Sequence, residues 1–163
     1  KKLYLSAITS NIFNINVNFK ENDIAIRAVE FLPNVKDSLF VGYKGGKKML
    51  HLVVPGENGM QDEFLSDKEQ RIIKGQFFTF NNPLVGAINF STSNNLIYCN
   101  SPNLVNVMSM ATRELSYFDS LQSFLFNKKT LHTINGLNIV LKNVLDNAKQ
   151  MPISTSNVMV DGA

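Results

Sequence analysis

The most suggestive chemistry in the chain lies in the run FVGYKGGKKMLHLVV at residues 40–54, where glycines and lysines stand together. A phosphate-binding P-loop has the spacing GxxxxGK followed by Ser or Thr, between a strand and a helix. Here Val41 stands at the first glycine position, and Met49 and the β-prone run LHLVV follow where the helix would begin. Without that helix, a phosphate would lack the free amide groups of a helix N-terminus. The run therefore predicts a structural turn rather than a phosphate loop.

We interpret this run as a β-hairpin whose tip is Gly45-Gly46. A two-residue type I′ turn needs positive φ at both central residues, and glycine reaches that conformation without steric cost. The predicted pairs are Val41 with Leu50 and Phe40 with His51.

The lysines at this tip, Lys44, Lys47 and Lys48, are the candidate anion-binding residues. They support an alternative function in binding anions or nucleic acid. The net charge argues against nucleic acid, because +3 from 16 basic and 13 acidic residues is a small surplus and nucleic-acid binders usually carry a basic stripe. Lysine also outnumbers arginine 13 to 3, although arginine makes the better bidentate contacts. We therefore expect no nucleic-acid partner.

The remaining polar residues show no spacing of a catalytic or metal site. The only histidines are His51 and His132, and the only cysteine, Cys99, excludes an internal disulfide. Free cysteine is commonly buried, so we expect Cys99 in the core and His51 as a packed, hydrogen-bonded side chain. The acidic segment 57–69 lacks the rhythm D-x-[DN]-x-[DN]-G of a calcium loop. We expect no catalytic residue, no metal and no cofactor, and the sequence shows no small-molecule ligand.

Two further patterns are weak. Asn89-Phe90-Ser91 fits the triplet of a glycosylation acceptor, but such triplets arise by chance in a chain with 21 asparagines. Near the C-terminus an apolar cluster stands in a polar segment, and its members, Val158, Met159 and Val160, are candidates for an arm that adds a strand to a neighbour's sheet.

Alternating apolar residues predict strands through the first hundred positions. The clearest run is IFNINVNF at 12–19, which alternates strictly. One face of the predicted strand carries Phe13, Ile15, Val17 and Phe19, and the other carries Ile12 and three asparagines. The other predicted strands are 3–8, 25–32, 38–44, 48–54, 76–80, 84–90 and 95–99. Strands with one solvent-exposed face and one face toward the core are typical of an antiparallel sheet.

Three segments predict helices. Ser66 followed by Glu69 fits a capping box, with Gly75 as the stop. In 102–126, steps of four and three connect the apolar residues Leu104, Met108, Ala111, Leu115, Phe118 and Leu125. A similar stripe predicts a helix over 137–150. The preceding Asn135-Gly136 leaves a second interpretation open, in which the flanking runs pair as a hairpin.

Together these elements predict an α+β fold: an antiparallel sheet or flattened sandwich of about seven to eight strands with one or two C-terminal helices. A chain of 163 residues is expected to form one domain, over 1–151, followed by a tail or arm over 152–163. No apolar run approaches the ~20 residues of a membrane-spanning helix. The single cysteine slightly favours a reducing compartment and leaves the localisation unknown.

The absence of a catalytic pattern favours a non-catalytic structural or protein-interaction module over an enzyme. Its expected partners are other protein chains, in a homo- or hetero-oligomer or a larger protein. The composition, rich in Asn, Lys, Ile and Phe, is typical of A+T-rich genomes, which indicates a low-GC bacterium, a phage or virus, or a parasite as the source. Viral or phage assembly is one setting in which such an interaction module would act. A second alternative is an enzyme whose residues converge only in three dimensions.

Overall fold

The computed structural model describes residues 14–19, 22–27 and 35–154 of the chain. The chain divides into two units, one of residues 40–149 and one of residues 1–39 with 150–163. The prediction of one domain over 1–151 with a tail over 152–163 is not tested and stays a prediction.

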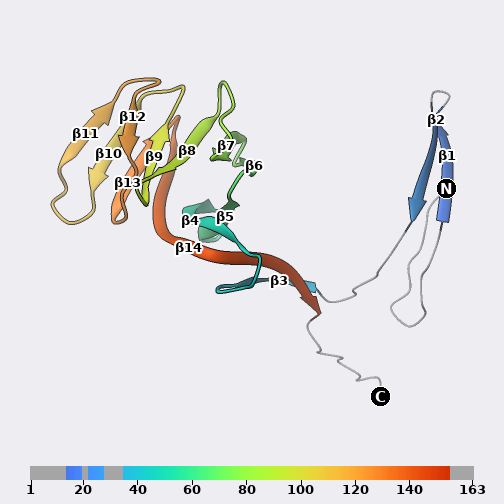
Figure 1. Cartoon of the computed structure of the whole chain (residues 1–163). Helices are drawn as coiled ribbons and strands as arrows, with labels where there is room; N and C mark the ends of the chain where they lie inside the picture. The colour runs from blue at the N-terminus through green and yellow to red at the C-terminus, as the bar shows by residue number, and fades with distance from the viewer. Residues whose placement is uncertain (1–13, 20–21, 28–34, 155–163) are drawn as a thin grey trace, which may run out of the picture. The chain divides into compact units, whose positions relative to one another are not determined.

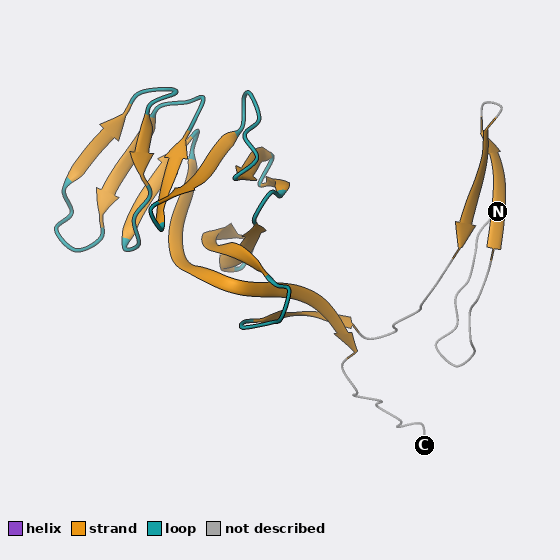
Figure 2. Cartoon of the chain, viewed as in Figure 1, coloured by secondary structure: helices purple, strands orange, loops and turns teal. Residues whose placement is uncertain are grey.

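Residues 40–149 contain two β-sheets, drawn as orange arrows in Figure 2 and labelled in Figure 1. The larger sheet has the strand order β11-β10-β13-β14-β4-β5, and β3 pairs in addition with β14. Its strands are β4 (Lys47–Gly56), β5 (Gly59–Ser66), β10 (Val105–Ser109), β11 (Leu115–Phe118), β13 (Thr130–Ile134) and β14 (Leu137–Ser154). All of β3 (Val35–Phe40) but its last residue, and β14 from Gln150 on, belong to the other unit. The smaller sheet has the order β12-β9-β8-β7-β6. Its strands are β6 (Gln70–Ile73), β7 (Gln76–Phe80), β8 (Ile88–Ser93), β9 (Leu96–Asn100) and β12 (Ser123–Leu125).

The two sheets pack face to face around one apolar core, to which both contribute. Among its fully buried members are Leu50, Leu52, Leu65, Phe78, Phe80, Phe90, Ile134 and Ile139. At one edge the ring of Phe118 on β11 stacks on Phe124 of β12, with centroids 4.4 Å apart. At the other edge β5 contacts β6 and β7. The edge strands of the two sheets therefore lie next to each other on both sides, as in an aligned β-sandwich.

In the other unit, β1 (Asn14–Phe19) and β2 (Asn22–Arg27) form an antiparallel hairpin that pairs Asn14 with Arg27 and Phe19 with Asn22. The alternation at 12–19 thus correctly predicts a strand. The predicted strand 3–8 lies outside the described residues.

The predicted α+β class is wrong, because the described part of the chain is all-β and contains no helix (Figure 2). The segment 102–126 forms β10, β11 and β12. Its core residues follow period two, since Val105 and Val107 are buried, as are Phe124 and Phe126. Most residues of the predicted helical stripe are exposed to solvent; Leu115, for example, is 78% exposed. The steps of four and three were a coincidence of spacing across three short strands.

The predicted helix over 137–150 is also wrong, and the hairpin interpretation of Asn135-Gly136 is confirmed. Both turn residues have positive φ, +48° and +78°, and Ile134 pairs directly with Leu137. The spacing of apolar residues in β14 resembles that of a helix because the register of β14 against β4 shifts twice. The shifts lie between Leu141 and Asn143 and between Leu145 and Ala148. Such bulges change which residues face the core. The buried Leu141 and Ala148 therefore stand seven residues apart, the spacing of two helical turns.

The predicted short helix after Ser66 is replaced by the turn between β5 and β6. The contact expected of a capping box does form, because the Ser66 amide donates to Glu69 Oε2 at 2.7 Å. Lys68 takes a positive φ of +63°, which reverses the chain at that point instead of starting a helix.

The predicted hairpin of 38–44 with 48–54 is wrong as well. β3 pairs with β14, whereas β4 pairs with β5 and β14, so Leu50 lies opposite Leu65 and His51 opposite Phe64. Gly45 has the positive φ of a turn residue, +84°, but Gly46 is required for another reason. A Cβ on Gly46 would lie 2.5 Å from the carbonyl oxygen of Asn147 and 2.8 Å from the amide of Ala148. The glycine pair thus combines one turn residue with one site of close backbone approach.

No helix in the described residues is long and apolar enough to span a membrane.

Candidate functional site

An unbroken apolar row crosses the outer face of the larger sheet. The strand register pairs Leu115 with Met108, Met108 with Leu131, Leu131 with Val140, and Val140 with Val53. These residues face outward because their chain neighbours, among them Leu52, Val107 and His132, are buried in the core. We call this set the outer row: Val53, Met108, Leu115, Leu131 and Val140.

One end of the outer row opens into a groove of about 370 Å³. Its apolar walls include Val53 and Val140 of the row, together with Met60 and Met110, which are 62% and 51% exposed. Three lysines complete the lining: Lys128, Lys129 and Lys142. An apolar floor with a basic rim is the main chemical feature of this face, and we call it the lysine-rimmed groove.

Two of the three lysines have partners. Lys142 Nζ lies 3.2 Å from Asp62 Oδ1, and that oxygen also lies 2.7 Å from His51 Nε2. These two contacts, His51 first, hold the pKa of Asp62 below its usual value. Lys128 Nζ donates to the neutral Asn143 Oδ1 at 2.7 Å. Lys129 has no ion-pair partner among the described residues. With a single carboxylate beside three ammonium groups, the groove carries a net positive charge.

The candidate anion-binding lysines do not form one cluster. Lys44 lies in the loop before β4, whereas Lys47 and Lys48 are successive strand residues and so point to opposite faces. Lys48 Nζ lies 3.7 Å from Asp146 Oδ1. Anion binding by these residues stays a prediction. The candidate arm, Val158, Met159 and Val160, lies outside the described residues.

The two histidines point to opposite faces of the larger sheet, since Leu50 and Leu52 beside His51 are buried and His132 is itself buried. His51 packs against the Phe64 ring at 4.5 Å and contacts Asp62, which confirms it as a packed, hydrogen-bonded side chain. Cys99 is buried as expected, and burial raises the pKa of its thiol. His132 is buried between the sheets against Phe126, with ring centroids 3.9 Å apart. Within the described ranges, no group of three His, Cys, Asp or Glu side chains could hold a metal ion.

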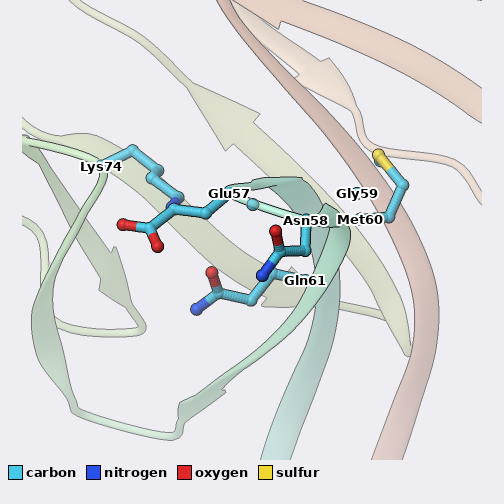
Figure 3. Close-up of a pocket in the computed structure, with 7 residues that line it drawn as sticks. Glu57, Asn58, Gly59, Met60, Gln61 and Lys74 are labelled. Carbon is cyan, nitrogen blue, oxygen red and sulfur yellow. The ribbon is translucent and has the colours of Figure 1, made fainter.

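Residues of the acidic segment line a separate polar pocket at the β4–β5 turn. Figure 3 shows Glu57, Asn58, Gln61 and Lys74 gathered around this turn, while Met60 points away from them. Met60 lines both this pocket and the lysine-rimmed groove. The turn therefore separates a polar pocket from the apolar groove.

The asparagine of the possible glycosylation triplet has a structural role. Asn89 Nδ2 donates to the carbonyl oxygens of Leu84 and Ala87, each at 3.0 Å, and Oδ1 accepts from the amide of Leu84 at 2.8 Å. Both amide protons are used, so a glycan on this nitrogen would break the loop that it holds.

Sequence reasoning missed the lysine-rimmed groove. The only available signal was the apolar character of both faces in the runs KMLHLVV and LNIVL. Apolar residues on both faces show that the outer face is unusual, but only the strand register shows that they form one row.

Comparisons of the chain with models of protein families, with curated proteins and with solved structures found no significant match. No finding supports the viral or phage assembly, or the oligomer, expected from the sequence.

Proposed function

We propose that this chain is a non-catalytic binding module, and that the outer face of its larger sheet binds a short acidic and apolar segment of another protein. The observation that carries this proposal is the outer row, which continues without a polar break across five strands. Contiguous exposed apolar patches with polar rims commonly mark interaction sites.

The length of the outer row favours a polypeptide as the ligand. Neighbouring strands lie about 4.8 Å apart, so four steps between five strands span about 19 Å. An extended segment of about six residues has the same length, at about 3.3 Å per residue. The row is thus long enough to take alternate side chains of such a segment.

The basic rim favours acidic residues beside the apolar ones. Lys128, Lys129 and Lys142 line the groove at one end of the row, and only Asp62 offsets their charge. A carboxylate on the bound segment would meet this positive potential, which favours correct pairing and fast association.

A selection from a random library of displayed twelve-residue peptides tests this proposal. We expect the enriched peptides to combine apolar residues with Asp or Glu, and their binding to weaken as salt is added. Val140→Asp, which places a carboxylate in the groove, should reduce their affinity at least about tenfold, or about 1.4 kcal/mol. Lys129→Glu should act in the same direction through charge.

The matched controls lie outside the groove. Ile72 is an exposed apolar residue of β6 and Lys74 an exposed turn lysine, so Ile72→Asp and Lys74→Glu should leave the affinity unchanged. Failure to enrich any peptide would refute the proposal. Peptides without acidic residues, or equal losses from Val140→Asp and Ile72→Asp, would refute it too.

A further inference from the structure

A second cavity, of about 510 Å³, lies on the inner side of the larger sheet. The register places Ser116, Val107 and His132 in one row on β11, β10 and β13, and Ser109 opposite Thr130 in the next row. Leu125 of β12 and Asn127 after it line the cavity from the smaller sheet. The cavity therefore lies at the edge of the sandwich where the edge strands β11 and β12 come together. Its volume falls within the roughly 300–1,000 Å³ of small-molecule sites.

Six polar side chains converge on this cavity: Ser109, Glu114, Ser116, Asn127, Thr130 and His132. They offer three hydroxyls, an amide and an imidazole, which both donate and accept hydrogen bonds, and a carboxylate, which accepts them. Glu114 uses Oε2 to accept from Thr112 Oγ1 at 2.9 Å, and Oε1 has no partner among the described residues. Phe118 and Leu125 add apolar surface.

His132 distinguishes this cavity from an ordinary gap between sheets. The residue is only 1% exposed, and its buried Nδ1 has no hydrogen-bond partner in the described part of the chain. Buried polar atoms are nearly always paired, and an unpaired one commonly marks a functional site or an unseen ligand. Burial lowers the pKa of His132 to about 4, so the imidazole is neutral near pH 7. A neutral imidazole can donate from one nitrogen and accept at the other.

The charge of the lining selects the class of ligand. Glu114 supplies a carboxylate, and no lysine or arginine lines the cavity. Anions would meet a negative field without a cationic partner. Uncharged polyols match the mixed donors and acceptors, because each hydroxyl both donates and accepts.

We propose that the cavity between β11 and β12 is a binding site for a small, uncharged, polyhydroxylated molecule of the sugar class, bound through Ser109, Glu114, Ser116, Asn127, Thr130 and His132. This site is on the opposite face of the sheet from the lysine-rimmed groove and does not depend on the function proposed above.

Titration of the ¹⁵N-labelled 163-residue chain, followed by amide chemical shifts, tests this inference. The probes are D-glucose, D-galactose and N-acetyl-D-glucosamine as neutral polyols, D-glucuronate as an anion and D-glucosamine as a cation. We expect at least one neutral sugar to give saturable shifts confined to β10, β11, β13 and residues 123–130. D-glucuronate should bind at least about tenfold more weakly, since the lining has no cation.

Two exposed lining residues allow substitution without disturbing the core. Ser116→Val and Asn127→Leu should each weaken sugar binding at least about fivefold, whereas Ser91→Val, on the exposed face of β8, should not. His132→Phe should abolish binding, and its amide spectrum shows directly whether the fold is kept. Absence of saturable shifts with every neutral sugar would overturn the inference. Tighter binding of D-glucuronate or D-glucosamine, or an equal effect of Ser91→Val, would overturn it as well.

Discussion

His132 should make the stability of the fold depend on pH. Burial lowers the pKa of this residue from 6.5 to about 4, while nearby backbone groups of Ile139 and Thr130 act in the opposite direction. Between pH 6.5 and 4 the unfolded chain therefore binds more protons at this residue than the folded chain. Stability is lost as the pH falls through this window, by at most about 1.4 kcal/mol per pH unit and by about 3 kcal/mol in total.

The variant His132→Phe should remove this part of the pH dependence. Its ring can stay against Phe126 and Phe124, which flank His132 in the core. Urea unfolding at pH 7.5, 6.5, 5.5 and 4.5 measures the effect by circular dichroism, since the chain has no tryptophan. Asp62 does not interfere, because its lowered pKa places its own loss of stability below pH 3.8. If the free energy of unfolding fell equally with pH in the unsubstituted chain and in His132→Phe between pH 6.5 and 4.5, this pH dependence would not come from His132.

Single residues were partly predictable from the sequence. Cys99 and His51 are placed as expected because burial of a small apolar thiol, and packing of a lone strand histidine, depend on residue type. Gly46 was misinterpreted, since its lack of a side chain serves a close approach to Asn147, about a hundred residues away in sequence. Residue type shows that a glycine is needed, but not which distant backbone makes it so.

At the scale of elements, the link between β7 and β8 is unusually short. The two strands run parallel, with Phe78 beside Ile88, yet only residues 81–87 connect them. Parallel neighbours usually need a crossover of a dozen residues or more. Asn89 holds the short link by its three bonds to Leu84 and Ala87, and it also accepts from Thr79 Oγ1 at 2.7 Å.

Asn89→Asp should therefore destabilise the chain. The aspartate keeps the acceptor oxygen but loses both donated protons, and it directs a charge toward two carbonyl groups. Leaving such groups unpaired costs about 1–3 kcal/mol each, so we expect a loss of about 2–6 kcal/mol in urea unfolding. The matched change Asn82→Asp affects an exposed residue with one 3.4 Å bond to Lys68 and should cost under about 0.5 kcal/mol. Similar losses for both variants would show that the link does not depend on Asn89.

Elements were predictable where one period lasted over a strand without interruption. Strict alternation identified β1, and compact apolar runs located β7 and β9. The helices predicted over 102–126 and 137–150 failed for physical reasons. Bulges in β14 displace its buried residues from period two, and three short strands happened to align their apolar residues at helical steps. A periodicity argument assumes one regular element, and neither segment is one.

The whole molecule explains why the candidate sites could not be found from sequence. The outer row gathers one residue from each of five strands, spread from Val53 to Val140. The inner cavity likewise combines both sheets. Each set exists only through register, which depends on pairings between distant segments and on the bulges of β14. The alternation within single strands could at most indicate that both faces of β4 and β14 are apolar.

The same long-range pairing predicts which part of the chain can fold alone. In the part of the chain whose burial the structure describes, every buried apolar residue lies between Met49 and Ala148. A fragment of residues 40–149 keeps this core, the pairing of β4 with β14 as far as Lys47 with Ala148, and the bond from the Tyr43 amide to the Asn147 carbonyl. We expect the fragment to retain β-sheet circular dichroism and a cooperative thermal transition within about 5 °C of the full chain, which corresponds to about 1–2 kcal/mol.

A shorter fragment of residues 40–140 provides the control. It lacks the part of β14 that pairs Leu141 with Leu52 and Val144 with Leu50, which leaves β4 unpaired on one side in the middle of the sheet. Loss of Leu141 alone removes a buried side chain that costs about 2–5 kcal/mol to truncate, and several backbone hydrogen bonds go with it. Because typical domains are stable by only about 5–15 kcal/mol, we expect this fragment to be unfolded. If 40–149 were unfolded as well, the sandwich would depend on residues 1–39 or 150–163, and the division into two units would not describe how the chain folds.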